Sequence, residues 1–421
     1  MSLFARAPLR VRPLLLLAIF VSALPVAAQN TAPALSAATA SAASLTLAEA
    51  FQLALAQQPW TLAASERQRE QLAREALADS WLADSPTIAS GLKTGNRDGL
   101  REFEIEISAP IATASRRSIQ VASVRSESAV YTANLAQLAL KLAGEVRDAY
   151  WVVLLAGSEL TLADDEVKRA EQVATDSARR TAAGDSARVD TLQAELTVQT
   201  LRSTRVDGAQ RLNAARQLLR GLIGDAASRG LTEVVETRDS AAPHALNDHP
   251  SLRLAGQSEQ LARAKLTEAS TLINGAPTVS FALTNEHSSG SANASTARIG
   301  VSFPFGGTQR ATPRIAQAGA ELAEAQASVP LLLRQLGAEA ASAQAAVISA
   351  ERRIDALTER ERLATEIATL YAKAHRLGEL DLPTRLRAEG ERANANLALS
   401  RARIEHKHAI SRVNQSLGLL P

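Results

Sequence analysis

The chain has 421 residues, contains no cysteine, and has few aromatic residues, which make up 3% of it. The absence of cysteine excludes disulfide frameworks, thiolate nucleophiles, zinc–thiolate sites and a lipid carried on an N-terminal cysteine. Since 46% of the residues are hydrophobic but only 3% are aromatic, the apolar content is mostly alanine and leucine. This composition favours long, closely packed helices and argues against a large β-sandwich or a doubly wound domain.

Sequence motifs of catalysis and metal binding are also missing. The chain has no glycine-rich phosphate loop, no nucleophile elbow and no His-Glu-x-x-His run. His406 and His408 are two positions apart on a predicted helix, so their side chains are expected to face different sides. We therefore expect no enzyme activity, no cofactor and no metal site.

The N-terminus has the three-part layout of a secretory signal peptide. Three arginines precede an apolar run over residues 14–24, and small residues favour cleavage after Ala28. The run is too short to cross a bilayer as a helix, so we expect export with loss of residues 1–28, followed by an extended segment, 29–44. Cleavage removes three arginines and no acidic residue, which changes the formal charge from +2 to −1 and leaves no support for a nucleic-acid partner.

The remaining sequence contains the same order of landmarks twice. Corresponding positions are separated by 191 to 194 residues: Pro59 and Pro250, Pro86 and Pro277, Pro110 and Pro304, Gly184 and Gly378, and Gly224 and Gly418. Such self-similarity indicates a duplicated structural unit. We predict a first repeat over 45–225, a linker over 226–247 and a second repeat over 248–421.

Each repeat is expected to begin with an amphipathic helix and to continue into one β-hairpin. The helices are predicted over 47–82 and 251–273, and the hairpins over 86–110 and 277–304, with 86–94 the weakest strand pattern. The other strands alternate apolar and polar residues around turns rich in Gly, Asn and Ser. The apolar members, which we expect to share one face, are Phe103, Ile105, Ile107, Val279, Phe281, Leu283, Ile299, Val301 and Phe303.

After each hairpin the pattern changes to a seven-residue period. Stepping by seven from Ile315 to Tyr371 gives nine apolar positions, a spacing that specifies left-handed supercoiled helix packing. Gly184 and Gly378 are expected to end these helices and let the chain return in a second helix. Pro330 is expected either to kink the second long helix or to mark its start.

The predicted fold class is mainly α with a small membrane β component. Strands of 8–10 residues can cross the apolar band of an outer membrane, but four strands cannot close a barrel, and open edges are not tolerated in lipid. Three copies would supply twelve strands and an α-barrel of long helical hairpins. The alternative is that the two hairpins form a small water-soluble cap on a helical rod.

The duplicated pattern resembles the TolC family of outer-membrane efflux proteins, particularly at 182–195 and 377–384, which are similar to that family's helix-hairpin tips. The resemblance implies a homotrimeric channel-tunnel in the cell outer membrane with a periplasmic α-helical extension. It also implies docking to a periplasmic membrane-fusion adaptor and an inner-membrane pump of the resistance-nodulation-division type. Such a channel conducts drugs, metal ions or other small molecules passively.

The same resemblance implies roles for the tips, because the family's tips form the periplasmic entrance. The pore and gate candidates are Asp185, Glu379 and Asp381, and the adaptor-contact candidates are Gly184, Ser186, Gly378 and Leu380. The alternatives are that the acidic residues are exposed helix caps and that the others serve turn geometry. The lipid bilayer of the outer membrane is the expected partner of the apolar strand residues.

A second function fits several of the same features. A soluble periplasmic coiled-coil adaptor or scaffold would also carry a signal peptide and long helical hairpins. Such adaptors usually contain one helical hairpin flanked by compact β modules, whereas this sequence predicts two copies of the hairpin and only short strands.

Overall fold

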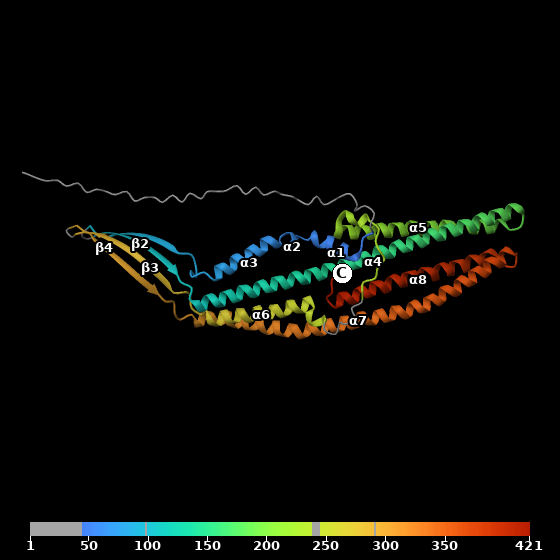
Figure 1. Ribbon diagram of the computed structural model, residues 1–421. Helices are drawn as coiled ribbons and strands as arrows, with labels where there is room; N and C mark the ends of the chain where they lie inside the picture. The colour runs from blue at the N-terminus through green and yellow to red at the C-terminus, as the bar shows by residue number, and fades with distance from the viewer. Residues whose placement is uncertain (1–43, 97–98, 238–244, 290–291) are drawn as a thin grey trace, which may run out of the picture. The chain divides into compact units, whose positions relative to one another are not determined.

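The computed structural model describes residues 44–96, 99–237, 245–289 and 292–421 (Figure 1). The predicted signal peptide, 1–28, and all but the last residue of the predicted extended segment lie outside the described residues. From Ala43 to Pro421 the chain forms one compact unit. None of the described helices contains an apolar stretch long enough to cross a membrane.

The helical stretch at the start of this unit is broken into three pieces. These are α1 (Leu47–Ala56), α2 (Pro59–Leu62) and α3 (Ala64–Ala78). The prediction of one continuous helix over 47–82 is therefore wrong. Pro59 has no N–H to donate and restricts the residue before it, and Gln58 accordingly adopts an extended conformation between α1 and α2.

The four strands form one antiparallel sheet in the order β1-β2-β3-β4. They are β1 (Thr87–Thr94), β2 (Arg101–Pro110), β3 (Thr278–His287) and β4 (Ala294–Ser302). The two predicted hairpins are confirmed, including the weakly patterned first strand. In addition, β2 and β3 pair along their whole length although they belong to different repeats. In the sheet as described, β1 and β4 are the edge strands.

Two antiparallel helical hairpins make up most of the unit (Figure 1). The helices are α4 (Ala114–Ala183), α5 (Arg188–Ile223), α6 (Pro250–Thr271), α7 (Thr308–Arg376) and α8 (Leu382–Ser416), with short 3₁₀ turns at Gly224–Ser228 and Ala245–Asp248. α4 packs with α5, α7 packs with α8, and α6 lies against both α4 and α7. Contacts between α4 and α8 join the two hairpins.

Pro330 lies inside α7, as does Pro313, so Pro330 does not mark the start of that helix. An interior proline removes one helix hydrogen bond and costs about 3 kcal/mol. Because α7 has 69 residues, the packing of the rest of the helix against α6 and α8 can offset that cost.

The largest buried side chains gather where α1 meets α4 and α5. Tyr150 and Trp151 are in edge-to-face contact, with ring centroids 5.9 Å apart, and Phe51, Leu219 and Ile223 are buried in the same cluster. Elsewhere the helices bury mainly alanine, with scattered leucine and valine. The few aromatic rings are thus concentrated at one level of the helices, which explains how so low an aromatic content supports the fold.

Candidate functional site

Both helical hairpins reverse direction at a glycine with positive φ. Gly184 has φ 84° and Gly378 has φ 80°, a left-handed conformation that glycine adopts without steric cost. The N–H of Asp185 donates to the carbonyl of Arg180 at 2.8 Å, and the N–H of Glu379 donates to that of Ala374 at 3.0 Å. These bonds satisfy the last carbonyls of each long helix, so the sequence prediction of helix ends at the two glycines is confirmed.

The three acidic gate candidates are exposed in the tips, with different local roles. Asp381 caps α8, because its carboxylate accepts a hydrogen bond from the backbone N–H of Thr384 at 3.3 Å. Hydrogen bonding to Thr384 lowers the pKa of Asp381, so this carboxylate stays ionised at neutral pH. Asp185 and Glu379 lie in the two turns, one on each hairpin. The structure thus assigns Asp381 the capping role that was one of its two predicted alternatives.

The four adaptor-contact candidates divide into two exposed and two half-buried residues. Gly184 and Gly378 are exposed. Ser186 is half-buried, and its hydroxyl shares a hydrogen bond of 2.9 Å with that of Thr181. Leu380 is half-buried, and its carbonyl accepts from Nδ1 of His375 at 2.9 Å.

Arg180 and His375 form a contact between the two tips that sequence reasoning did not identify. Nη1 of Arg180, on α4, donates to the backbone carbonyl of His375, on α7, at 3.1 Å. The same Nη1 lies 3.3 Å from Nε2 of the His375 ring. We call this pair of interactions the tip contact. The two residues are 195 positions apart, and neither residue type belongs to a recognisable motif.

The tip contact, between α4 and α7, follows a series of contacts that α4 makes with α8. Glu159 accepts from Arg401, Glu166 accepts from Arg392 at 2.8 Å, Val173 packs against Leu382, and Arg180 meets His375. The α4 residues of this series follow one another at intervals of seven. A spacing of seven along α4 thus brings these four residues against the other hairpin.

The register of the strands gives the sheet two chemically different faces. Paired residues of neighbouring antiparallel strands point to the same side, and Ile105 pairs with Leu283 and Phe281 with Ile299. The predicted apolar residues within β2, β3 and β4 therefore share one face, which we call the apolar face. Phe303, which was predicted to belong to it, lies just after the end of β4 at Ser302. Ile88 and Leu92 of β1 lie on it as well, since they pair with Ile107 and Phe103.

The opposite face, which we call the polar face, carries alternating glutamates. Glu102, Glu104 and Glu106 lie in a row on β2, and each has a cationic neighbour. Lys93 bonds to Glu102 at 3.0 Å, and Arg298 reaches Glu104 at 2.9 Å and Glu106 at 3.5 Å. One face thus suits an apolar environment and the other suits water.

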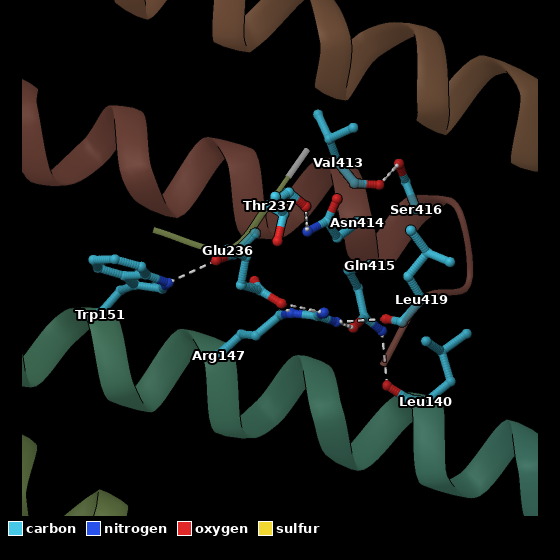
Figure 2. A network of polar contacts seen from close by, with 11 residues as sticks. Leu140, Arg147, Trp151, Glu236, Thr237, Val413, Asn414, Gln415, Ser416 and Leu419 are labelled. Atoms are coloured by element: carbon cyan, nitrogen blue, oxygen red, sulfur yellow. Dashed lines mark hydrogen bonds and ion pairs between the residues drawn. The ribbon is translucent and has the colours of Figure 1, made fainter. Parts of the chain in front are cut away.

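A buried polar network fixes the segment between the repeats onto α4 (Figure 2). The side chain of Arg147 is 1% exposed and makes a bidentate ion pair with Glu236, at 2.7 and 3.1 Å. Its Nη1 also donates to Gln415 Oε1 at 2.5 Å and to the carbonyl of Leu419 at 3.0 Å. One arginine therefore connects α4, the linker segment and the C-terminal residues.

A tyrosine beside this network holds the first described residues in place. The hydroxyl of Tyr150 lies 2.9 Å from the carbonyl of Leu45 and 2.5 Å from that of Thr232. Burial raises the pKa of Tyr150 to about 12, so it remains a hydroxyl donor at neutral pH. The N–H of Leu45 donates to the carbonyl of Gly230 at 2.7 Å, which completes the attachment. Sequence reasoning identified neither Arg147 nor Tyr150, because their partners are distant in the chain.

Within the part of the chain that the structure describes, no group of three or more His, Asp or Glu side chains is arranged to hold a metal ion.

Comparison with known proteins gives matches at the level of structure. No protein-family model matches the sequence, and no curated protein matches it. The outer-membrane channel OprN superposes with a TM-score of 0.72 at 20% identity, covering 88% of this chain and 89% of OprN. The outer-membrane protein VceC from Vibrio cholerae gives 0.71 at 14% identity, covering 88% of this chain and 96% of VceC.

The open state of the outer-membrane channel MtrE from Neisseria gonorrhoeae gives a TM-score of 0.68 at 16% identity, with 89% of each chain covered. The described chain therefore has the fold of these outer-membrane channels. The predicted fold class, long helical hairpins with a small four-stranded β component, is confirmed.

Proposed function

We propose that this chain is the outer-membrane channel of a tripartite efflux system, through which drugs, metal ions or other small molecules pass without chemical change. The observation that carries the proposal is the sheet, which has one apolar face and two edge strands and belongs to a fold found in outer-membrane channels.

Closure of the sheet requires other copies of the chain. The edge strands β1 and β4 have backbone N–H and C=O groups that must find partners in lipid, since an open edge there costs several kcal/mol per unpaired group. Pairing β4 of one copy with β1 of the next satisfies both edges. Three copies then form a twelve-stranded barrel with the apolar face toward lipid and the polar face toward the lumen.

The helices have matching unpaired faces. α5 exposes Leu192, Leu196 and Val206, and α7 exposes an apolar row that includes Leu363 and Ile367. Exposed apolar rows of this kind mark interaction surfaces. In a homotrimer, α7 of one copy packs against α5 of the next, so that the helices close into an α-barrel at the same time as the strands.

The orientation follows from the position of the sheet. With the sheet in the outer membrane, α4 and α7 extend into the periplasm, and α4 alone has 70 residues, about 105 Å at 1.5 Å per residue. The tips then form the periplasmic entrance, with Asp185, Glu379 and Asp381 around the pore. Gly184, Ser186, Gly378 and Leu380 are positioned to meet a membrane-fusion adaptor, which links the channel to an inner-membrane pump of the resistance-nodulation-division type.

The signal peptide, the two repeats and the linker also have roles in the proposed channel. Residues 1–28 direct export and are cleaved, 45–225 and 248–421 are the two wall-forming repeats, and 226–247 belongs to an equatorial layer. The attachment of the linker by Arg147 and Glu236 supports this position. The alternative of a soluble adaptor loses support, because the fold that matches is that of outer-membrane channels.

The proposal is tested by expressing the full chain in a Gram-negative host, separating the membranes, and recording currents from the purified protein in planar lipid bilayers. We expect the protein in the outer-membrane fraction and stepwise conductance in the bilayer. Release in the soluble periplasmic fraction, or an outer-membrane protein without conductance, would contradict it.

A further inference from the structure

A cavity of about 1180 Å³ lies at the level where α6 begins and α8 ends. Its walls come from residues 137–148 of α4, 336–346 of α7 and 405–416 of α8, together with His249 and Ser251 at the start of α6. Among the described residues, none from α3 or α5 lines it. The cavity is therefore formed by both repeats of one chain, away from the α5 surface that is proposed to meet a second copy.

Two cations in the wall of this cavity have no partner within the described part of the chain. Lys141 on α4 and Arg412 on α8 are exposed, and neither makes a hydrogen bond or an ion pair with a described residue. Their positive charges are therefore available to a ligand. Glu339 on α7 is the one carboxylate of the lining without a partner among the described residues, so the available cations outnumber it.

The remaining charged groups of the wall bond to other residues. Asp148 is hydrogen-bonded to His408 at 2.8 Å, and Glu405 accepts from Arg353 at 3.0 Å.

The buried guanidinium of Arg147 also lines the cavity, and it is held by Glu236, Gln415 and the carbonyl of Leu419 (Figure 2). This part of the wall is fixed by its own contacts and keeps its shape without a ligand.

A buried histidine adds a neutral hydrogen-bond donor to the wall. His249 lines the cavity and is 3% exposed. Its Nδ1 accepts a hydrogen bond from the backbone N–H of Ser251 at 3.2 Å, so the hydrogen of the neutral ring is on Nε2. Burial lowers the pKa of His249, which keeps the ring neutral at neutral pH. Nε2 can then donate to an acceptor but adds no charge.

Much of the remaining lining is apolar, and it comes from three helices. Leu140 and Leu336 are buried, and Leu138, Ala343 and Ala409 are half-buried. An apolar group that rests against these side chains is removed from water, which favours binding. Apolar walls with a few charged groups are typical of small-molecule sites.

We propose that this cavity binds an amphipathic organic anion, a ring system that carries a sulfonate or carboxylate group. The anionic group contacts Lys141 and Arg412, and the rings lie against the apolar residues of α4, α7 and α8. The volume is at the upper end of the range for small-molecule sites, about 300–1,000 Å³, so compounds of two or three rings fit. Because the two cations belong to different helical hairpins, the bound anion links the repeats. The site does not depend on the proposed function.

Binding is tested with naphthalene-1-sulfonate, which has an apolar ring system and one negative charge. The purified full chain in phosphatidylcholine nanodiscs is titrated by calorimetry, with empty nanodiscs as the blank. We expect one anion per chain with a Kd of about 0.1 mM, an ordinary affinity for a ligand of about 14 non-hydrogen atoms. Inorganic sulfate, which has no rings, and 1-naphthylmethylamine, which is a cation, should each bind at least about tenfold more weakly.

Two variants locate the bound anion. K141Q/R412Q removes both cations and should raise the Kd for naphthalene-1-sulfonate at least about tenfold, since contacts to charged groups are lost. Both side chains are exposed, so the circular dichroism spectrum and the unfolding midpoint should not change. R352Q/R403Q is the matched control, because it removes two exposed arginines of α7 and α8 that lie outside the lining. This control should keep the Kd of the parent protein.

Three results would overturn the proposal: no saturable heat above the blank in the parent protein, equal binding of the amine and the sulfonate, or equal weakening by the two double variants. The outcome is separate from that of the proposed function. A parent protein that binds the sulfonate but does not conduct would refute the channel and leave the site in place. A conducting protein without saturable binding would refute the site alone.

Discussion

Replacement of Arg147 by methionine should destabilise the protein more than the loss of any exposed ion pair. The side chain of Arg147 is 1% exposed and that of Glu236 is 12% exposed. Arg147 makes four hydrogen bonds, two of them to Glu236 and the others to Gln415 and the carbonyl of Leu419. Methionine fills a similar volume but satisfies none of these acceptors.

The expected loss in the free energy of unfolding depends on the charge of Glu236, which loses its partner. Removing one member of a buried ion pair leaves the other charge without a partner and costs about 3–5 kcal/mol. Because Glu236 keeps some access to water, we expect a loss near about 3 kcal/mol in the free energy of unfolding. In R147M/E236Q the unpaired charge is gone, and about half of the loss should be recovered.

Trp151 provides the assay. It lies one helical turn from Arg147, is buried, and donates from Nε1 to Ser411 at 2.9 Å. With Trp60 and Trp81 replaced by phenylalanine, guanidinium unfolding followed by tryptophan fluorescence reports on the region of the network. The variant should unfold at lower denaturant concentration with an unchanged dependence on denaturant.

The control is Arg353→Met, which breaks the exposed pair of Arg353 and Glu405 and should cost less than about 1 kcal/mol. An Arg147→Met protein as stable as this control would show that the network does not hold the linker in place.

Three further predictions concern Tyr150, the sheet and the tip. Tyr150→Phe should lower the free energy of unfolding by about 1–3 kcal/mol, because two carbonyls lose their donor. Since the pKa of Tyr150 is raised to about 12 from about 10 in an unfolded chain, its contribution is complete below about pH 10 and is lost as the pH rises to about 12. Denaturant unfolding at several alkaline pH values checks this sign, and pH-independent stability between pH 10 and 12 would contradict it. On the apolar face, Ile105→Lys should cost about 2–4 kcal/mol per chain in the bilayer and reduce recovery of the protein in the outer-membrane fraction. Thr284→Lys, on the polar face, should not reduce this recovery. Equal recovery of the two variants would refute the orientation of the sheet. At the tip, Asp381→Asn should keep the cap on α8 and reduce the cation preference of single channels, and an unchanged reversal potential under a salt gradient would remove Asp381 from the gate.

The sequence was most informative where local chemistry determines the structure. The seven-residue period predicted the long helices, and Gly184 and Gly378 predicted their ends, because a reversal with positive φ favours glycine at one position. The alternation of Phe103, Ile105 and Ile107 with glutamates predicted a strand with two unlike faces. These features depend on residues that are close together in the chain.

Features that depend on distant partners were not predicted. The pairing of β2 with β3 joins segments from different repeats, and Arg147 and Glu236 are 89 positions apart. The break in the first helical stretch was missed because the periodicity continues through Gln58 although Pro59 interrupts the hydrogen bonds. For Pro330 the sequence left a position inside the helix and a position at its start open, because local propensity does not show whether packing keeps a proline within a helix, and the structure has it inside α7.

On the proposed function, the chain becomes a closed channel by joining with two further copies. Native mass spectrometry of the protein, extracted from outer membranes in mild detergent, tests this most directly. We predict a complex of three chains whose assembly is lost when the exposed apolar row of α7 is interrupted by Ile367→Lys. A stable single chain, or a complex of any other number, would contradict it.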